Sequence, residues 1–142
     1  MRIEEKEGVT GYVQLMLNGA EVGKHNLVLT AGKQWIASRI AGGGTGASHI
    51  AVGSGSTPAA LANTGLEAEI ARKAVVVPGG VASGNTVTYE VTFDETEGNG
   101  ELREASLNLA ATGATAVARV VFPIITKTDT DLFTVHWTLT IN

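Results

Sequence analysis

Residues 49–72, HIAVGSGSTPAALANTGLEAEIAR, have the composition of a loop that could hold a phosphate group in front of a helix. A phosphate-binding loop of the Gly-x-x-x-x-Gly-Lys-Ser/Thr type needs its lysine to reach the terminal phosphate. The segment GSGSTPAA has no lysine there, and it has Pro58 where a dinucleotide-binding turn would lead to a third glycine. We therefore predict a structural loop formed by Gly53, Gly55, Thr57 and Pro58. Its glycines would supply backbone angles that other residues avoid, and its proline would fix the exit of the chain.

The residue types that act as nucleophiles or metal ligands show no local arrangement for either role. The chain has no cysteine, and its histidines, His25, His49 and His136, are too far apart for a local metal signature. Its serines lie outside any Gly-x-Ser-x-Gly nucleophile elbow, although a triad assembled only in space would leave no such mark. We expect no catalytic, metal-binding or cofactor-binding residues, and so a protein that is not an enzyme.

Residues 94–101, DETEGNGE, gather four carboxylates around two glycines. An EF-hand calcium loop has acidic or amide side chains at its third and fifth positions, which are Thr96 and Gly98 here. A solvated hairpin tip is the better interpretation of this segment. Asp129 and Asp131 are interpreted in the same way, as turn residues that bond their own backbone.

Two pairs of opposite charge are candidates for structural ion pairs. Arg119 shares a predicted strand face with two valines, so its guanidinium must reach solvent or find a carboxylate such as Glu104. A structural role for this pair is preferred to a catalytic one. Arg72 and Glu69 form the second candidate pair.

Composition favours one domain over residues 1–142 with many turns and strands. The chain is 44% hydrophobic and only 17% charged, and it contains 18 glycines. A net charge of −4 without a cluster of Lys and Arg argues against nucleic-acid binding. The first residues, MRIEEKEG, lack the apolar centre of a signal peptide, and the longest apolar runs span only a few residues. We expect a protein made without export and not inserted into a membrane.

Alternation of apolar and polar residues predicts a mostly antiparallel β-sandwich of about seven or eight strands. The pattern is clearest over residues 86–93 and 133–141, and Asn18-Gly19 is typical of a tight hairpin turn. Pro123 predicts a bulge or an edge within its strand. Without a repeated strand–helix–strand rhythm, a sandwich is the expected arrangement.

One short α-helix is expected near residues 31–41. Thr30 could cap it, while Trp35, Ile36 and Ile40 would share its buried side. A run of glycines from residue 42 would end it. A brief helical turn at most is expected before a strand from about Arg72 to Val77.

Four segments, taken in order, resemble small tail proteins of tailed bacteriophages of the tail-fibre or baseplate kind. They are NLVLTAGKQWIASRIAGG, HIAVGSGSTPAALANTGLEAEIAR, LREASLNLA and ARVVFPIITKTDTDLFTVHWTLTIN, within residues 26–142. The most specific positions are Gly53, Gly55, Thr57, Pro58, Thr64, Leu66, Glu69, Ile70, Arg72, Arg119, Phe122, Lys127 and Trp137. Two positions depart from the pattern: Asn63 replaces a common aspartate, and Ser106 stands in a segment that more often reads EAGL.

The resemblance implies a non-enzymatic structural component of a phage tail, found in the virion and assembled in the host cytoplasm. Its partners would be copies of itself, for which a trimer is expected only because trimers are common among fibre proteins, and neighbouring tail or baseplate proteins. Many identical copies turn modest interfaces into strong attachment. Residues 1–25 lie outside the resemblance and are expected to form an N-terminal arm or hairpin used for attachment.

The sequence leaves three other functions open. A module that binds a host-surface glycan or receptor would serve the same particle, although the sequence has few aromatic residues to stack on sugars. A capsid decoration protein would have a similar size and β content. A glycan hydrolase comes last, because it would need two carboxylates such as Glu90 and Glu104 side by side in an open cleft.

Overall fold

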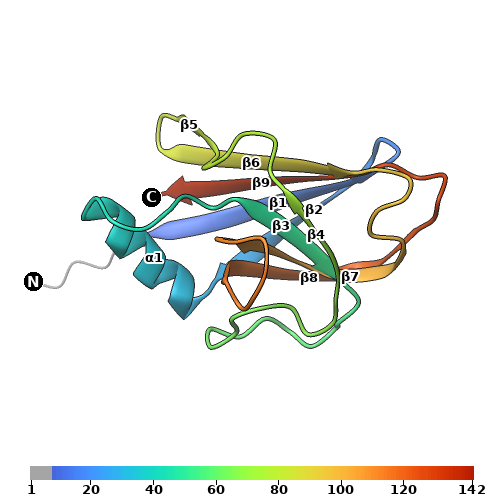
Figure 1. The fold of residues 1–142 in the computed structure, drawn as a ribbon, viewed down its shortest axis with the longest axis horizontal. Coiled ribbons are helices and arrows are strands. Elements are labelled where there is room, and N and C mark those ends of the chain that lie inside the picture. Colours follow the sequence, from blue (N-terminus) through green and yellow to red (C-terminus); the bar gives the residue numbers. More distant parts are fainter. Residues whose placement is uncertain (1–7) are drawn as a thin grey trace, which may run out of the picture.

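The computed structural model describes residues 8–142, which form nine β-strands and one α-helix (Figure 1). In chain order the elements are β1 (Val9–Leu17), β2 (Ala20–Val28), α1 (Thr30–Ile40), β3 (His49–Gly53), β4 (Glu69–Ala74), β5 (Val81–Ser83), β6 (Thr86–Phe93), β7 (Gly100–Asn108), β8 (Ala116–Lys127) and β9 (Phe133–Ile141). The expected mostly β architecture with antiparallel pairing is confirmed, with one strand more than the upper estimate.

The nine strands belong to one sheet, so the prediction of a two-layer sandwich is wrong. The strand order is β4-β3-β7-β8-β2-β1-β9-β6-β5, and the sheet curls into a half-barrel. Strand β2 makes the sheet continuous, because Ala20–Asn26 pair with β1 while Leu27 and Val28 pair with β8. Alternation of apolar and polar residues shows only that one face of each strand is buried. A curled single sheet buries one face of its strands, as a sandwich does, so the two arrangements give the same sequence pattern.

The two distant parts of the curled sheet approach each other where β4 faces β6. The amide of Val76 donates to the carbonyl of Glu90 at 2.9 Å. The ammonium of Lys73 donates to the carbonyl of Thr92 at 2.7 Å and pairs with Glu97 at 2.5 Å. These contacts link β4 to β6 without a regular strand ladder between them.

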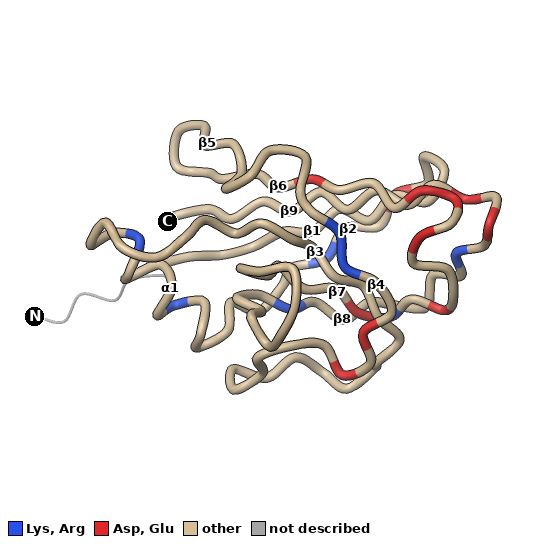
Figure 2. The backbone as a smooth tube through the Cα atoms, in the orientation of Figure 1, with Lys and Arg blue, Asp and Glu red and all other residues tan. Residues whose placement is uncertain are grey.

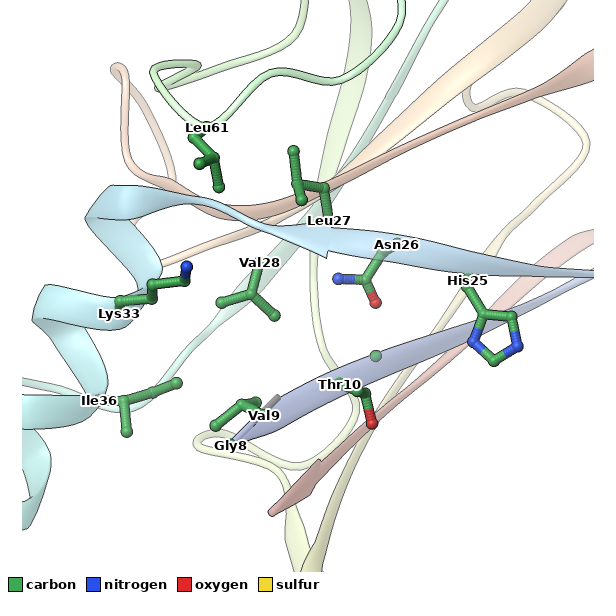
Figure 3. Close-up of a pocket in the computed structure, with 11 residues that line it drawn as sticks. Gly8, Val9, Thr10, His25, Asn26, Leu27, Val28, Lys33, Ile36 and Leu61 are labelled. Carbon is green, nitrogen blue, oxygen red and sulfur yellow. The ribbon is translucent and has the colours of Figure 1, made fainter. Parts of the chain in front are cut away.

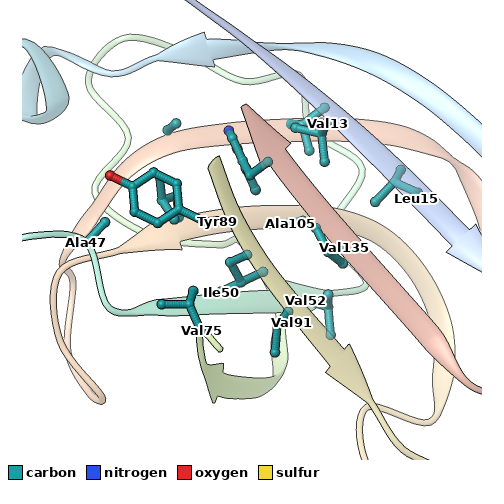
Figure 4. Close-up of a cluster of buried hydrophobic side chains, with 14 of the residues drawn as sticks. Val13, Leu15, Ala47, Ile50, Val52, Val75, Tyr89, Val91, Ala105 and Val135 are labelled. Carbon is teal, nitrogen blue, oxygen red and sulfur yellow. The ribbon is translucent and has the colours of Figure 1, made fainter. Parts of the chain in front are cut away.

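The concave face of the half-barrel holds the hydrophobic core (Figure 4). The alternation predicted for β6 and β9 is confirmed over most of their length, since Tyr89, Val91, Phe93 and every second residue from Phe133 to Leu139 are buried. Trp137 has no exposed surface, and its indole N–H donates to Asn26 Oδ1 at 3.1 Å. The buried indole therefore has the partner that its N–H requires.

Helix α1 is confirmed almost residue for residue, but its details differ from the expectation. Leu29 occupies the cap position and no side chain caps the helix, so Thr30 is the first helical residue. Gly32 is needed for packing, because a Cβ there would lie 2.1 Å from the carbonyl oxygen of Val117. Ile40 is 82% exposed and not part of the buried side.

Two local predictions have opposite outcomes. The bulge expected at Pro123 is present, since the pairing of β7 with β8 shifts between Leu102–Ile125 and Glu104–Val121. The strand expected from about Arg72 to Val77 instead spans Glu69–Ala74 as β4, and no helical turn precedes it in the described chain. Tertiary pairing with β3 outweighs the helix propensity of that segment.

Residues 1–7 of the expected N-terminal arm lie outside the described residues, and the remainder is a central part of the sheet. The hairpin formed by β1 and β2 stands between β9 and β8 in the strand order. Its tip is also tied down, because Asn18 Nδ2 donates to Asp131 Oδ1 at 2.7 Å. This hairpin is therefore not a separable arm.

Removal of residues 1–25 should abolish cooperative folding, because it deletes β1 and most of β2 and leaves β8 and β9 without the strands between them. We expect the truncated chain to show no sharp thermal transition by circular dichroism, whereas the full chain shows one. A cooperative transition in the truncated chain would mean that the hairpin is dispensable.

Candidate functional site

The loop that links β3 to β4 is organised around the carboxylate of Glu104. Glu104 lies on β7 and has no exposed surface. Its Oε2 accepts hydrogen bonds from the amides of Gly55 at 2.7 Å and Ala68 at 2.8 Å, and its Oε1 accepts one from the amide of Glu67 at 2.9 Å. A buried carboxylate therefore joins the two ends of the loop.

Arg119 compensates the charge of Glu104. Its Nη2 lies 3.0 Å from Glu104 Oε1, its Nε lies 3.2 Å from the same oxygen, and its side chain is 2% exposed. Its remaining Nη1 donates to Asn63 Oδ1 at 3.2 Å, so it also holds the middle of the loop. Removing either charge from such a pair leaves the other buried and uncompensated.

A second carboxylate, Glu67, shapes the exposed part of the same loop. It accepts a hydrogen bond from the hydroxyl of Thr57 and others from the amides of Ser56, at 3.0 Å, and Thr57, at 3.3 Å. The Thr57 hydroxyl, followed by the Thr57 amide, lowers the pKa of Glu67. These hydrogen bonds form with the ionised carboxylate, so they stabilise the folded protein at pH values above the ordinary pKa of a glutamate. Their contribution is lost as the pH falls through the lowered pKa that Glu67 has in the folded protein.

Gly53 and Gly55 serve the loop for a different reason from the one expected. Neither has a φ in the left-handed region, so unusual backbone angles do not explain them. A Cβ on Gly55 would lie 2.5 Å from Glu104 Oε2, and one on Gly53 would lie 2.4 Å from the carbonyl oxygen of Ala68. Glycine is therefore required at both positions because the backbone closely approaches its neighbours, which are Ala68 and Glu104 at Gly53 and Glu67 and Glu104 at Gly55. Pro58 lies on the exposed outer part of the loop.

The second predicted pair lies beside this loop. Arg72 Nη2 is 2.7 Å from Glu69 Oε1, and the same guanidinium donates to the carbonyls of Ala110 at 3.0 Å and Gly113 at 2.9 Å. Arg72 thereby fastens β4 to the turn between β7 and β8. The structure brings each of the two predicted pairs together, but as two separate clusters.

None of these groups is arranged as a catalytic centre. Both oxygens of Glu104 accept hydrogen bonds from fixed donors, so they are not available to exchange protons with a substrate. Glu90 is exposed on β6 whereas Glu104 has no exposed surface, so these two residues do not form the pair of carboxylates in an open cleft that a glycan hydrolase needs. Within residues 8–142 no group of three or more His, Asp or Glu side chains could hold a metal ion.

One contact between a nucleophile and a base was missed by the sequence analysis. Ser48 Oγ lies 2.7 Å from His49 Nδ1, and both residues are half-buried. Among the hydrogen bonds of residues 8–142, no carboxylate contacts the His49 ring, which a catalytic triad would need to orient the base. The two residues are adjacent in the chain, so we interpret the contact as local. His25 contacts the ring of Tyr12, and His136 pairs across the sheet with Glu90 and Gln14.

A hollow lies between α1 and the adjacent ends of β1 and β2 (Figure 3). It has a volume of about 580 Å³ and a mostly apolar wall to which Val28, Ile36 and Leu61 contribute. Its polar groups are few and include Lys33 and Asn26, whose buried Nδ2 has no hydrogen-bond partner. This set of groups offers neither a nucleophile paired with a base nor a ligand set for a metal.

Comparisons with protein-family models, curated proteins and solved structures found no match for this chain. Across residues 8–142, no helix is both long and apolar enough to cross a membrane.

Loss of the Glu104 charge should destabilise the protein strongly. We expect Glu104→Gln to lower the free energy of unfolding by about 3–5 kcal/mol, because Arg119 stays buried without its partner. The matched control is Glu101→Gln, which breaks the more exposed pair with Arg103 at 3.1 Å and should cost about 1 kcal/mol or less. Urea unfolding of both variants measures the difference. Equal effects would show that the buried pair has no special role.

A methyl group at Gly55 should also be destabilising, by about 1–3 kcal/mol, because it overlaps Glu104 and Glu67. Gly65 offers a matched control in the same loop, since a Cβ there meets nothing within 4 Å. We expect Gly55→Ala to lower the thermal midpoint clearly and Gly65→Ala to leave it nearly unchanged. Similar midpoints for the two variants would contradict the close-approach explanation.

Proposed function

We propose that this protein is a non-enzymatic structural subunit of a bacteriophage tail, of the tail-fibre or baseplate kind. It would act in the virion through contacts with copies of itself and with neighbouring tail proteins, after assembly in the host cytoplasm. The segments that resemble phage tail proteins are the reason for proposing a location in the tail. The surface of the protein supports the proposal that it acts through contacts with other subunits.

The observation that carries the proposal is an exposed apolar surface at one end of the molecule. Ile40 at the end of α1 is 82% exposed, and Ile141 at the end of β9 is 47% exposed. Both line one groove of about 350 Å³ between α1 and the sheet, together with Val9, Val87 and Trp35. Side chains of this kind gathered around a groove are typical of a surface that a protein partner covers.

The loop network fits the same role. Glu104 and Arg119 fix a long connection to the sheet through several hydrogen bonds, and they do so without exposing a reactive group. A subunit that repeats in an assembly benefits from a rigid body, because little conformational entropy is then lost when copies associate. The network therefore holds the loop in one conformation and presents no reactive group at the surface.

A free strand edge adds a second possible contact. Strand β5 stands at the end of the strand order and pairs only with β6. It is three residues long, and Val81 within it is half exposed. An unpaired edge can accept a strand from a neighbouring protein.

Exposed aromatic residues are too few to favour the glycan-binding alternative. Tyr12 is the one aromatic side chain in residues 8–142 that is largely exposed, at 42%. Sugar-binding surfaces commonly stack on aromatic rings, and Trp137, Phe93 and Tyr89 are buried in the core. A capsid decoration protein would use the same apolar surface. Only the position of the protein in the particle distinguishes that function from the proposed role in the tail.

The proposal predicts self-association that depends on the apolar end. Light scattering should give the purified full chain a mass that is a multiple of 14.6 kDa, and Ile40→Asp should reduce this mass because it places a charge in the contact. Ile124→Asp is the matched control, since Ile124 is exposed on β8 and does not line the groove. A monomer at every concentration, together with binding to host-surface polysaccharide, would contradict the proposal and favour the receptor-binding module.

A further inference from the structure

The two ends of the molecule carry opposite charge. Figure 2 shows acidic residues over the loops at the end opposite α1, whereas α1 itself carries only basic ones. The acidic end consists of the β6–β7 and β8–β9 loops, which lie together because Phe93 pairs with Phe133. Its acidic residues are Asp94, Glu95, Glu97, Asp129 and Asp131. Two lysines lie at the same end: Lys73 pairs with Glu97 at 2.5 Å, and the buried Lys127 donates to the carbonyl of Asp94, so the carboxylates without an ion-pair partner give this end its exposed negative charge. The basic residues of α1 are Lys33 and Arg39.

Local hydrogen bonds keep charge on the acidic end. The pKa of Asp94 is lowered, first by the amide of Thr96 and then by its hydroxyl. The pKa of Asp131 is lowered by the amide of Thr128 and by the Asn18 side chain. Both carboxylates are therefore ionised at neutral pH.

An apolar side chain projects from this acidic end. Leu132 is 47% exposed and directly follows Asp131. Its backbone is held on both sides by Asn18, whose amide donates to the carbonyl of Leu132 at 3.0 Å and whose Oδ1 accepts from the amide of Leu132 at 2.9 Å. Leu132 is thus presented on a fixed turn, which lowers the entropy lost when it is buried by a partner.

The opposite end has the complementary features. The groove between α1 and the sheet is apolar along Trp35, Ile40 and Ile141, and Arg39 lies in its wall. Helix α1 has no acidic residue in its first turn, and Arg39 is the basic residue of its last turn. An apolar side chain accompanied by carboxylates is therefore the kind of group that this groove would accept.

Leu132 cannot reach the groove of its own molecule. Leu132 immediately precedes β9, and Ile141 is the last residue of that nine-residue strand. At about 3.3 Å per residue, the two positions are roughly 30 Å apart. A contact between these surfaces has to join two copies of the chain.

We propose that copies of this protein stack head to tail, with Leu132 of one copy inserted into the groove between α1 and β9 of the next. The acidic loops of the first copy would then face Arg39 and Lys33 of the second. This inference rests on the proposed self-assembly and names its surfaces. Because the surfaces are different and lie at opposite ends, the contact is heterologous and continues from copy to copy, without closing after two.

Charge disfavours the two symmetric alternatives. Pairing groove to groove would bring Arg39 and Lys33 of two copies together, and pairing acidic end to acidic end would bring the carboxylates together. Juxtaposed like charges oppose association. Head-to-tail contact is the arrangement in which both ends meet the opposite charge.

The test uses two variants, each with one surface disabled. Ile40→Asp disables the groove and keeps Leu132, whereas Leu132→Asp keeps the groove. The full chain should give a light-scattering mass that rises with protein concentration and falls in about 0.5 M salt, which screens the charges. Each variant alone should stay monomeric. An equimolar mixture should form a complex of two copies and no larger, because it contains one intact groove and one intact Leu132 surface per pair.

Controls and opposing outcomes separate this inference from the proposed function. Ile124→Asp should associate like the unchanged chain, and circular dichroism should show that all three variants keep the fold. If Leu132→Asp associates normally while Ile40→Asp does not, copies pair through the groove alone, which overturns stacking and leaves self-assembly standing. A trimer of constant mass that neither Leu132→Asp nor salt changes would also overturn stacking. A full chain that stays monomeric at every concentration would overturn stacking, and binding to host-surface polysaccharide in addition would overturn the proposed function.

Discussion

A carboxylate that is shielded from solvent needs hydrogen-bond donors around it. This requirement at Glu104 organises the β3–β4 loop and its attachment to the sheet. Three amides from the β3–β4 loop and the guanidinium of Arg119 meet its two oxygens. The loop must bring its backbone close enough to donate, which leaves no space for a side chain at Gly53 or Gly55. The shape of the loop and its glycine positions therefore depend on one buried charge, which also links β7 to β8 through Arg119.

The same requirement explains why the loop has the composition of a phosphate site although its amides point to carboxylates of the chain itself. Glycines and free amides are what an anion site needs. In this protein the anion is internal, because Gly55, Glu67 and Ala68 donate to Glu104 while Ser56 and Thr57 donate to Glu67. Donors that are already occupied by the chain's own carboxylates are not free for a ligand. The anion-binding amides that the composition suggests thus bind carboxylates of the chain itself and stabilise the loop.

A rigid half-barrel with two unlike ends is suited to repetition. The core fixes the strands, and strand β9 separates the groove with its apolar and basic wall from the acidic turn that bears Leu132. In the proposed head-to-tail stack, each end would contact the unlike end of a neighbouring copy. Assembly through these ends would need no moving part and no cofactor, which agrees with a function based on contacts.

The sequence by itself determined the properties that depend on neighbouring residues: the alternating strands, the helix at Thr30–Ile40, the bulge at Pro123 and the opposite charges of Arg119 and Glu104. Only the tertiary structure decided that β2 continues from β1 to β8, that the sheet curls instead of dividing in two, and why Gly53 and Gly55 are glycines. The physical reason is that periodicity records which face of a strand is buried, whereas strand partners and close approaches depend on residues far apart in the chain. Ile40 illustrates the difference, since it fits an apolar helix face by its spacing and is exposed because no strand of the same copy covers it.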